Sequence, residues 1–433
     1  MCVCENVEKE SGLPVIIPAP SKMYLSNCLQ KMVFALRDVE YVSRFQRFFG
    51  LEVLEEEAEE DLDSKEVNAA GGDGGGKQTT TSRRAVHNKG SSQSSSLADS
   101  IPSSATRYRI NNHFWYYLFS FGSKLGYEFF YSLSFSYCYW NVDSFLCRRL
   151  MLVWALLMYV GQALKELIRW PRPSGPSIII LEPAYSFEYG MPSTHAILAL
   201  SIPVNLFHLL LPRYSFSVGV FALCAFAWCS LICCSRLYLG MHSVLVSSSI
   251  IFHIPLTNHH PLLQDIIAGL ALTATLLVPL LPLVDSIDHF LVFRPLAPPV
   301  LLAVLVAAGT LYPSATDPRS PSRGDTCVMI AATAGVYLST WLHYHLGLMV
   351  TLGGKQPALY SIHLPGVDQL PVLLLRTVLG LLVIAAFRFL GKTLICQLLK
   401  RVCGLDTAPS KDGRRRAVVE VPTKLFTYLM VSW

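Results

Sequence analysis

Two apolar runs joined by a short turn decide the organisation of this chain: "YGMPSTHAILALSIPVNLFHLLLPRYSFSVGVFALCAFAWCSLICCSRLYLGMH" (Tyr189–His242). Ala196–Leu211 and Phe216–Cys234 are each close to the length at which a helix crosses a bilayer. The turn "LPRYS" (Leu211–Ser215) between them is rich in breaker residues. A hairpin of two spans would therefore return the polar motifs at both ends of the stretch to the same membrane face.

The composition of the whole chain also indicates a membrane protein. Of its 433 residues, 52% are hydrophobic and only 15% are charged, which is fewer charged residues than soluble domains carry. We therefore predict an all-α, polytopic transmembrane helical bundle. Eight runs near spanning length are the candidate spans: Phe114–Ser136, Leu150–Leu164, Ala196–Leu211, Phe216–Cys234, Ile266–Val284, Leu296–Leu311, Val328–Val350 and Leu370–Phe389.

The amino-terminal region differs from the rest of the chain. Glu55–Asp63 is acidic, and Ala69–Ser104 is rich in Gly, Ser and Thr. Such a composition cannot bury an apolar core, so we expect residues 1–106 to be largely disordered. Apolar residues at mixed helical spacing make a short helix possible within Tyr24–Leu54.

Several function classes receive little support from the sequence. The formal net charge of +5 is typical of membrane-protein loops, and no aromatic-interleaved basic patch indicates nucleic-acid binding. The cysteines do not have zinc-site spacing. The amino terminus does not read as a signal peptide. "SRGDT" (Ser322–Thr326) contains Arg-Gly-Asp, but a three-residue match is weak evidence for adhesion.

The first polar cluster, "KELIRWPRP", follows the Leu150–Leu164 run. It contains Lys165 and Arg172, whose ammonium and planar guanidinium groups both suit phosphate oxygens. Taken alone, this cluster is more simply read as an ordinary basic membrane flank.

The second cluster, "YGMPSTHA", lies immediately before the Ala196–Leu211 run. Ser193 or Thr194 can cap that helix and place hydroxyl and backbone N–H groups where an anion would bind. His195 beside them could transfer a proton. A helix cap with a surface histidine is again the simpler reading of this cluster alone.

The third cluster, "SRLYLGMH", ends the second run and contains Ser235, Arg236 and His242. Arg236 could bind phosphate and His242 could attack it. The first cluster ends a span, and a loop without a span leads from it to the second cluster. The hairpin then returns the third cluster to the same side, so all three reach one membrane face at one depth. Polar groups gathered there are functional candidates by default.

The three clusters resemble the signature of the type 2 phosphatidic acid phosphatase (PAP2) superfamily, K-x6-RP, PSGH and SR-x5-H-x3-D. "LIRWPRP", "EYGMPSTHA", "SRLYLGMHS" and "SRGDT" further resemble the sphingosine-1-phosphate phosphatases, in which PSTH replaces PSGH. The resemblance covers roughly Phe45–Leu54 and Asn111 to about Tyr428. It implies a six-helix core like that of the vanadium haloperoxidases, expected at residues 111–284, with additional C-terminal spans and a tail in residues 285–433.

The resemblance also implies a mechanism. His242 would be the nucleophile and would form a phosphohistidine, an aspartate would orient it, and His195 would protonate the leaving lipid oxygen. The phosphate would be held by basic and hydroxyl side chains: Lys165, Arg172, Ser193, Thr194 and Arg236.

The aspartate is displaced in this sequence. The motif places it four residues after His242, where Val246 stands, and the first acid after the histidine is Asp265. Removing Val246–Gln264 restores "GMHSVLDIIAG", so we infer a 19-residue insertion. Its first and last residues are compatible with the codons of a short retained intron, and a lineage-specific loop is the other interpretation. Adjacent His259 and His260 within it are weak evidence for a metal.

These observations predict a multi-pass membrane phosphatase of sphingosine 1-phosphate and related sphingoid base phosphates, without metal or cofactor. The resemblance implies the endoplasmic reticulum membrane, with the catalytic face in the lumen. Two alternatives stay open: a PAP2 phosphatase for another lipid phosphate, and a catalytically impaired splice form with a lipid-binding or regulatory role.

Two spans before Lys165 would put the amino terminus on the catalytic face, unless Phe114–Ser136 is re-entrant. The apolar end, Leu425–Trp433, is too short to cross a bilayer.

Overall fold

A computed structural model describes residues 42–54, 108–170, 172, 177–185, 188–242, 265–313, 320–348, 360–361, 366–404 and 413–432. Most of them are helical, which confirms the predicted all-α membrane fold. The helices are α3 (His113–Lys124), α4 (Glu128–Asn141), α5 (Ser144–Ile168), α6 (Thr194–Leu210), α7 (Val218–Tyr238), α8 (Asp265–Phe293), α9 (Ala297–Leu311), α10 (Ser322–His345), α11 (Leu370–Cys403) and α12 (Gly413–Val431), with a 3-10 turn, η1, at Pro183–Tyr185.

Strands are short and marginal to the architecture. β1 (Leu51–Val53) pairs antiparallel with β2 (Tyr108–Ile110), and β3 (Tyr214–Ser215) pairs parallel with β4 (Tyr360–Ser361). The predicted disorder of residues 1–106 falls almost entirely outside the described residues. Within the Tyr24–Leu54 range, residues 42–48 are helical, as the apolar spacing suggested.

The described helices include five that are long and apolar enough to cross a membrane: α5, α7, α8, α10 and α11. Helices α6 and α9 are apolar but shorter. They correspond to seven of the eight candidate spans. Helix α8 runs without a break through Val284, so the expected end of the core domain falls inside it.

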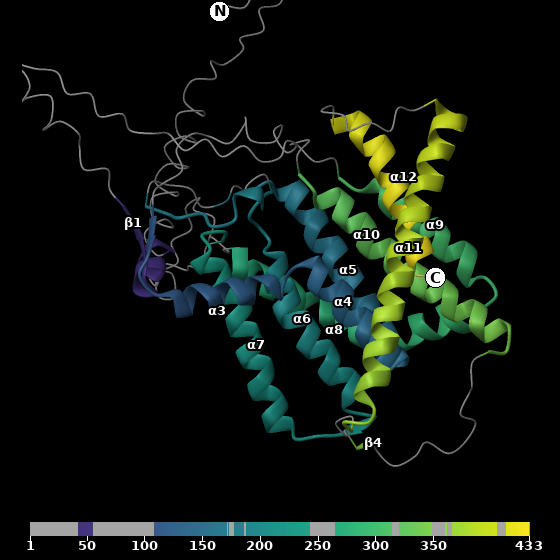
Figure 1. The fold of residues 1–433 in the computed structure, drawn as a ribbon, viewed down its shortest axis with the longest axis horizontal. Helices are drawn as coiled ribbons and strands as arrows, with labels where there is room; N and C mark the ends of the chain where they lie inside the picture. Colours follow the sequence, from purple (N-terminus) through teal and green to yellow (C-terminus); the bar gives the residue numbers. More distant parts are fainter. Residues whose placement is uncertain are drawn as a thin grey trace, which may run out of the picture.

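The first candidate span, Phe114–Ser136, is not one helix. It is divided between α3 and α4, which have 12 and 14 residues and are separated at Leu125–Tyr127. Figure 1 shows α3 lying across the bundle, unlike the long helices. The apolar run was long enough for a span, but the break brings Gly126 against His195, as described below.

Capping residues fix where the central helices begin. Asp143 accepts hydrogen bonds from the backbone N–H groups of Phe145 and Leu146 at the start of α5. Ser193 does the same for α6, through Ala196 N–H, so Ser193 and not Thr194 is the N-cap. At the other end of α5, Arg169 adopts a left-handed conformation with φ 56° and ends the helix.

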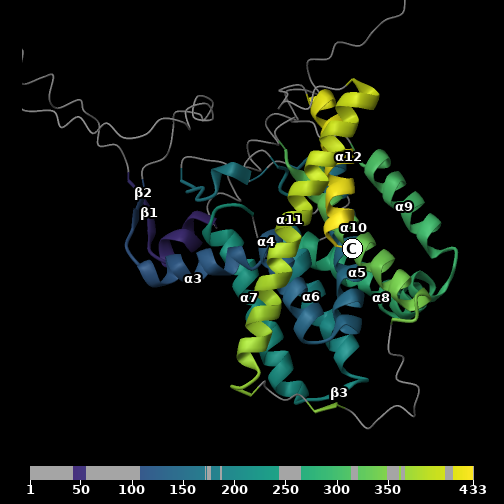
Figure 2. The ribbon, with the colours of Figure 1, turned by 45° about the vertical axis from the view of Figure 1, so that its right-hand side comes forward.

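The bundle core is formed by α5, α6, α8 and α10, which pack against one another, with α7 against α6 and α4 against α5. The end of α5, the start of α6, the end of α7 and the start of α8 meet at one end of the bundle (Figures 1 and 2). This arrangement is the one that the hairpin argument predicted for the three motif clusters.

A buried ionic group ties three helices together away from this end. Asp288 on α8 accepts from Arg148 Nε of α5 at 2.7 Å and from the Tyr337 hydroxyl of α10 at 3.0 Å. Arg149 Nε lies 3.1 Å from its other oxygen. Because each partner is on a different helix or a different face, this group fixes how α5, α8 and α10 pack.

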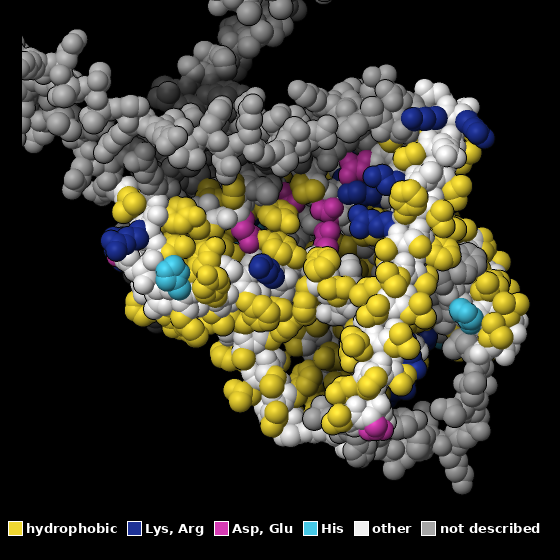
Figure 3. All heavy atoms as spheres, viewed as in Figure 1, with side chains coloured by type: hydrophobic (Ala, Val, Ile, Leu, Met, Phe, Trp, Pro, Cys, Tyr) yellow, Lys and Arg dark blue, Asp and Glu magenta, His cyan; other side chains and the backbone are white. Residues whose placement is uncertain are grey.

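The outer helices present apolar surface. Leu223 and Phe226 on α7, and Leu374 and Leu382 on α11, are each more than 60% exposed. Figure 3 shows hydrophobic side chains covering α7 and the lower part of α11, whereas most charged side chains of this face lie in its upper half. Such a distribution is typical of helices that face lipid.

Candidate active site

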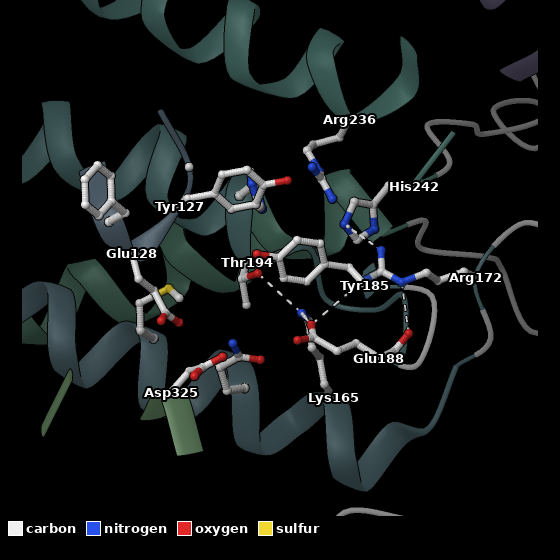
Figure 4. A pocket seen from close by; sticks show the side chains of 15 residues that line it. Tyr127, Glu128, Lys165, Arg172, Tyr185, Glu188, Thr194, Arg236, His242 and Asp325 are labelled. Atoms are coloured by element: carbon white, nitrogen blue, oxygen red, sulfur yellow. Dashed lines mark hydrogen bonds and ion pairs between the residues drawn. The ribbon is translucent and has the colours of Figure 1, made fainter. Parts of the chain in front are cut away.

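The motif residues surround one cavity of about 320 Å³ at the end of the bundle where α5, α6 and α7 meet. Its lining combines the expected basic residues and histidines with carboxyl, amide and apolar side chains (Figure 4). The residues are Gly126, Tyr127, Glu128, Phe129, Met158, Gln162, Lys165, Arg172, Tyr185, Glu188, Thr194, His195, Arg236, His242 and Asp325.

His242 and Asp265 are in contact despite the residues inserted between them. His242 Nδ1 lies 3.3 Å from Asp265 Oδ2, and both side chains are 1% exposed. The other ring nitrogen, Nε2, lies on the cavity side, 3.4 Å from Arg172 Nη1. A carboxylate at Nδ1 holds the imidazole in the tautomer whose Nε2 lone pair is available to an electrophile.

Contacts with α6 hold Asp265 in place. The backbone N–H of Ser193 donates to the carbonyl of Asp265 at 2.9 Å. One turn into α8, a side chain at Gly269 would come within 2.6 Å of the Ser193 carbonyl, so only glycine permits this approach. The start of α8 is therefore docked on the start of α6.

Three cations point into the cavity, and two carboxylates that the motif analysis did not single out pair with them. Lys165 Nζ lies 3.1 Å from Glu188 Oε2, and Arg172 Nη2 lies 3.7 Å from the same oxygen. Arg236 Nη1 lies 2.9 Å from Glu182 Oε2 and 2.8 Å from the Ser123 hydroxyl. These pairs orient the three cations toward the same space.

The environment shifts the ionisation of the groups in the loops. Burial lowers the pKa of His242 well below its usual range, and Arg172 and Arg236 lower it further, so the imidazole is neutral. Burial also lowers the pKa of Arg172 to about 10, which leaves it charged at neutral pH. Burial alone raises the pKa of Glu188, but Lys165 and Arg172 outweigh it and hold that pKa below the usual range.

His195 lies on the same cavity with one ring nitrogen unused. Its Nε2 is buried and has no hydrogen-bond partner among the described residues. The Tyr127 ring packs edge-on against it at a centroid distance of 5.4 Å. A side chain at Gly126 would come within 2.6 Å of Nε2, so the break between α3 and α4 leaves space for this imidazole.

The expected site residues are thus brought together, in two layers. Lys165, Arg172, Thr194, His195, Arg236 and His242 line the cavity. Thr194 Oγ1 accepts from Lys165 Nζ at 3.3 Å. Ser193 and Asp265 lie behind this lining, where Ser193 caps α6 and Asp265 contacts His242.

A second polar group lies at another side of the cavity and was not expected. It comprises Glu128 at the start of α4, Gln162 on α5 and Asp325 at the start of α10. Asp325 belongs to the "SRGDT" stretch, whose Ser322 hydroxyl donates to Glu166 Oε1 at 2.9 Å. Burial raises the pKa of Glu128 to about 8, and the neighbouring Asp325 contributes to the same shift.

Sequence reasoning missed Glu128, Gln162, Glu182, Glu188 and Asp325 because none belongs to the three clusters. The signal that could have found the acids is their rarity, since each lies beside an apolar run in a chain with few charges. No group of three or more His, Cys, Asp or Glu side chains in the described ranges is arranged to hold a metal ion.

Comparisons with known proteins show which sequences this chain resembles. Residues 147–246 match the model of the PAP2 superfamily. The chain is 35% identical over 330 residues to sphingosine-1-phosphate phosphatase 1 of Mus musculus, covering 75% of this chain and 71% of that protein. For sphingosine-1-phosphate phosphatase 2, the identity is 35% in Mus musculus (76% and 87% covered) and 34% in Homo sapiens (75% and 76% covered). No solved structure matches the chain.

Proposed function

Because this chain belongs to the sphingosine-1-phosphate phosphatases of the PAP2 superfamily, it is a membrane-bound lipid phosphate phosphatase, and we propose that it hydrolyses sphingosine 1-phosphate through a phosphohistidine. The observation that carries this proposal is the contact of His242 Nδ1 with Asp265 Oδ2 at 3.3 Å, beside a cavity lined by three cations. Related sphingoid base 1-phosphates are substrates of the same kind.

In the first step, Nε2 of neutral His242 attacks phosphorus and the bond from phosphorus to the lipid oxygen breaks. Asp265 accepts from Nδ1–H and stabilises the positive charge that develops on the imidazole. His195 donates a proton from Nε2 to the departing lipid oxygen, so the alcohol leaves neutral. The dianionic phosphate itself favours the protonated form of His195 before this transfer.

In the second step, water attacks the phosphorus of the phosphohistidine. His195 takes the proton from this water, the phosphorus–nitrogen bond breaks, and His242 regains its lone pair. One water is consumed, and the products are the sphingoid base and inorganic phosphate. Lys165, Arg172 and Arg236 are charged donors directed at the phosphate oxygens, with Thr194 beside Lys165 and Ser193 at the helix start.

Several features bear on the setting of this reaction. The exposed apolar faces of α7 and α11 and the five long apolar helices support a multi-pass membrane protein. On the resemblance to the family, we place the protein in the endoplasmic reticulum membrane with the cavity open to the lumenal side. Both steps use this chain's own side chains and one water molecule.

The insertion does not separate the catalytic pair, because α6 holds Asp265 beside His242. This favours an active enzyme over an impaired splice form, and the relatives' substrate favours sphingosine 1-phosphate over other lipid phosphates. Whether Val246–Gln264 originates from a retained intron or a lineage-specific loop is decided by the genomic sequence at its boundaries.

The test is phosphate release from sphingosine 1-phosphate by membranes containing the full chain, the chain without Val246–Gln264, and each with His242→Ala. We expect both parent proteins to be active and His242→Ala to abolish activity in both. Acid-quenched labelling with ³²P-labelled substrate should trap phosphohistidine in the parents only. Activity of the deleted form alone would support the impaired splice form, and no release by either would refute the enzyme assignment for this substrate.

A further inference from the structure

The polar group formed by Glu128, Gln162 and Asp325 has no role in the chemistry described above. In Figure 4, Glu128 and Asp325 lie on the opposite side of the cavity from Arg236 and His242, with Thr194 drawn between them. The cavity therefore joins a cationic end, suited to phosphate, to an end that presents carboxyl and amide oxygens.

The oxygens at this end have unused capacity to accept hydrogen bonds. Gln162 is 5% exposed, and its Oε1 has no hydrogen-bond partner in the part of the chain that the structure describes. Glu128 forms no side-chain hydrogen bond or ion pair within the same residues. Asp325 has one cationic neighbour, Lys424, at 3.4 Å from Oδ1. A buried acceptor without a partner, such as Gln162 Oε1, is costly, so a donor-bearing ligand at this end would be stabilised.

The depth of this polar group relative to the phosphate site follows from α5. Met158, Gln162 and Lys165 all line the cavity and follow one another at helical spacing on one face. Gln162 therefore lies about 4.5 Å along the helix axis from Lys165, on the side toward the membrane interior. Met158 lies a further turn inward.

Helix α10 brings Asp325 to a similar depth. Ser322, at its start, bonds to Glu166 next to Lys165, and Asp325 is one turn further along α10. Gln162 is one turn back along α5 from Glu166, and α5 and α10 pack against each other. Both Asp325 and Gln162 are therefore displaced inward from the Ser322–Glu166 contact.

We propose that Glu128, Asp325 and Gln162 Oε1 form a cation subsite that binds the ammonium group of a sphingoid base 1-phosphate. This rests on the proposed function, whose substrate carries an ammonium group on the carbon next to the phosphorylated one. The same lipid would place its phosphate among Lys165, Arg172 and Arg236. Lipid phosphates without this ammonium lack the donor that the oxygens accept, and they are thereby disfavoured.

The remaining lining agrees with such a binding mode. Phe129 follows Glu128 in the chain, Met158 lies one helical turn before Gln162, and both line the same cavity. The Phe129 side chain is 75% exposed. An aliphatic chain that begins beyond the ammonium-bearing carbon would meet these apolar side chains.

The test compares two lipids with the full chain in phospholipid nanodiscs: sphinganine 1-phosphate, and its analogue with a hydroxyl in place of the ammonium. Glu128→Gln and Asp325→Asn remove charge with little change of shape. Glu420→Gln is the matched control, since Glu420 also pairs with Lys424, at 2.9 Å, but does not line the cavity. We expect Glu128→Gln to raise KM for the ammonium lipid about tenfold and KM for the analogue less than twofold, with kcat little changed.

The selectivity ratio separates the cation subsite from a structural role. The subsite would be overturned if both cavity variants raised KM equally for the two lipids, or raised it for neither. It would also be overturned if Glu420→Gln changed the KM ratio of the two lipids as much as the cavity variants do. Displacement of labelled sphinganine 1-phosphate from the corresponding His242→Ala proteins measures binding without turnover. If the parent protein hydrolyses neither lipid, the proposed function fails, and the binding comparison still decides on the subsite.

Discussion

At the scale of residues, the sequence predicted the motif positions because their spacing reports on the ends of neighbouring helices. Lys165, Thr194, His195, Arg236 and His242 line one cavity, as expected. The carboxyl groups that pair with the cations could not be predicted, since Glu182 and Glu188 lie between α5 and α6 in a segment whose described residues form only the 3-10 turn η1. The spacing of the three motif clusters also did not show how far inside the helical bundle their side chains lie.

Asp265→Asn tests the role of the displaced carboxylate. The amide keeps the shape of the side chain but cannot stabilise a positively charged imidazole, so we expect kcat to fall by about a hundredfold or more. Steady-state hydrolysis of sphingosine 1-phosphate is the measurement. Asp285→Asn, an exposed carboxyl on the same helix, is the control and should stay near the parent. A change of less than threefold in Asp265→Asn would argue against its role.

The pH profile tests the ionisation of His242. Its folded pKa is lowered, so the neutral nucleophile persists as the pH falls through the usual histidine range of about 6.5 and is lost only below it. We expect the acid limb of kcat/KM to lie below this value. Arg172→Gln removes one cause of the lowered His242 pKa, so it should move the acid limb of kcat/KM to higher pH. The ionisation of the substrate is the same for both proteins. An unchanged limb in this variant would contradict the electrostatic explanation.

At the scale of elements, apolar runs were sufficient to locate most spanning helices, and they failed where packing overrides composition. Phe114–Ser136 reads as one span, yet it forms α3 and α4 around Gly126, which lies against His195. Gly126 is visible in the sequence, but nothing in the sequence indicated that it would lie against His195. The helix that ends the described chain, α12, packs on α10 and α11 and includes most of the short apolar end.

The buried group around Asp288 gives a prediction for helix packing. Asp288→Asn would leave Arg148, which is 4% exposed, without its counter-ion, at a cost of about 3 kcal/mol. We expect the midpoint of thermal unfolding in detergent to drop by several degrees. Asp285→Asn again serves as the control, because Asp285 also pairs with Arg149 but its carboxyl is 67% exposed. An unaltered midpoint would mean that α5, α8 and α10 are held by apolar packing alone.

At the scale of the whole molecule, the hairpin argument was the decisive step from sequence to fold. It placed three clusters on one face, and the ends of α5, α6, α7 and α8 do meet there. The number of spans before Lys165 puts the amino terminus on this face only if Phe114–Ser136 crosses the membrane, and that run is divided between α3 and α4. Gln46 donates to the carbonyls of Ile179 and Tyr238 at 2.7 and 2.9 Å, which places this segment on the catalytic face.

This placement predicts the sidedness of the chain. The natural sequence has no Asn-x-Ser/Thr acceptor, so an inserted acceptor reports on its own position. We expect an acceptor placed ahead of residue 42 to be glycosylated and one placed in the Leu211–Ser215 turn to remain unmodified. Mobility shifts removed by endoglycosidase are the measurement. Modification at both positions, or the reverse pattern, would contradict a shared face for the amino terminus and the cavity.

The docking of α8 on α6 has an evolutionary consequence. The Ser193–Asp265 backbone contact and the close approach at Gly269 hold the aspartate through contacts between two helices. The α7–α8 connection is thus a position where a gene can gain or lose coding sequence without dismantling the catalytic pair. For the same reason it is the natural point at which to divide the enzyme into two separately expressed fragments.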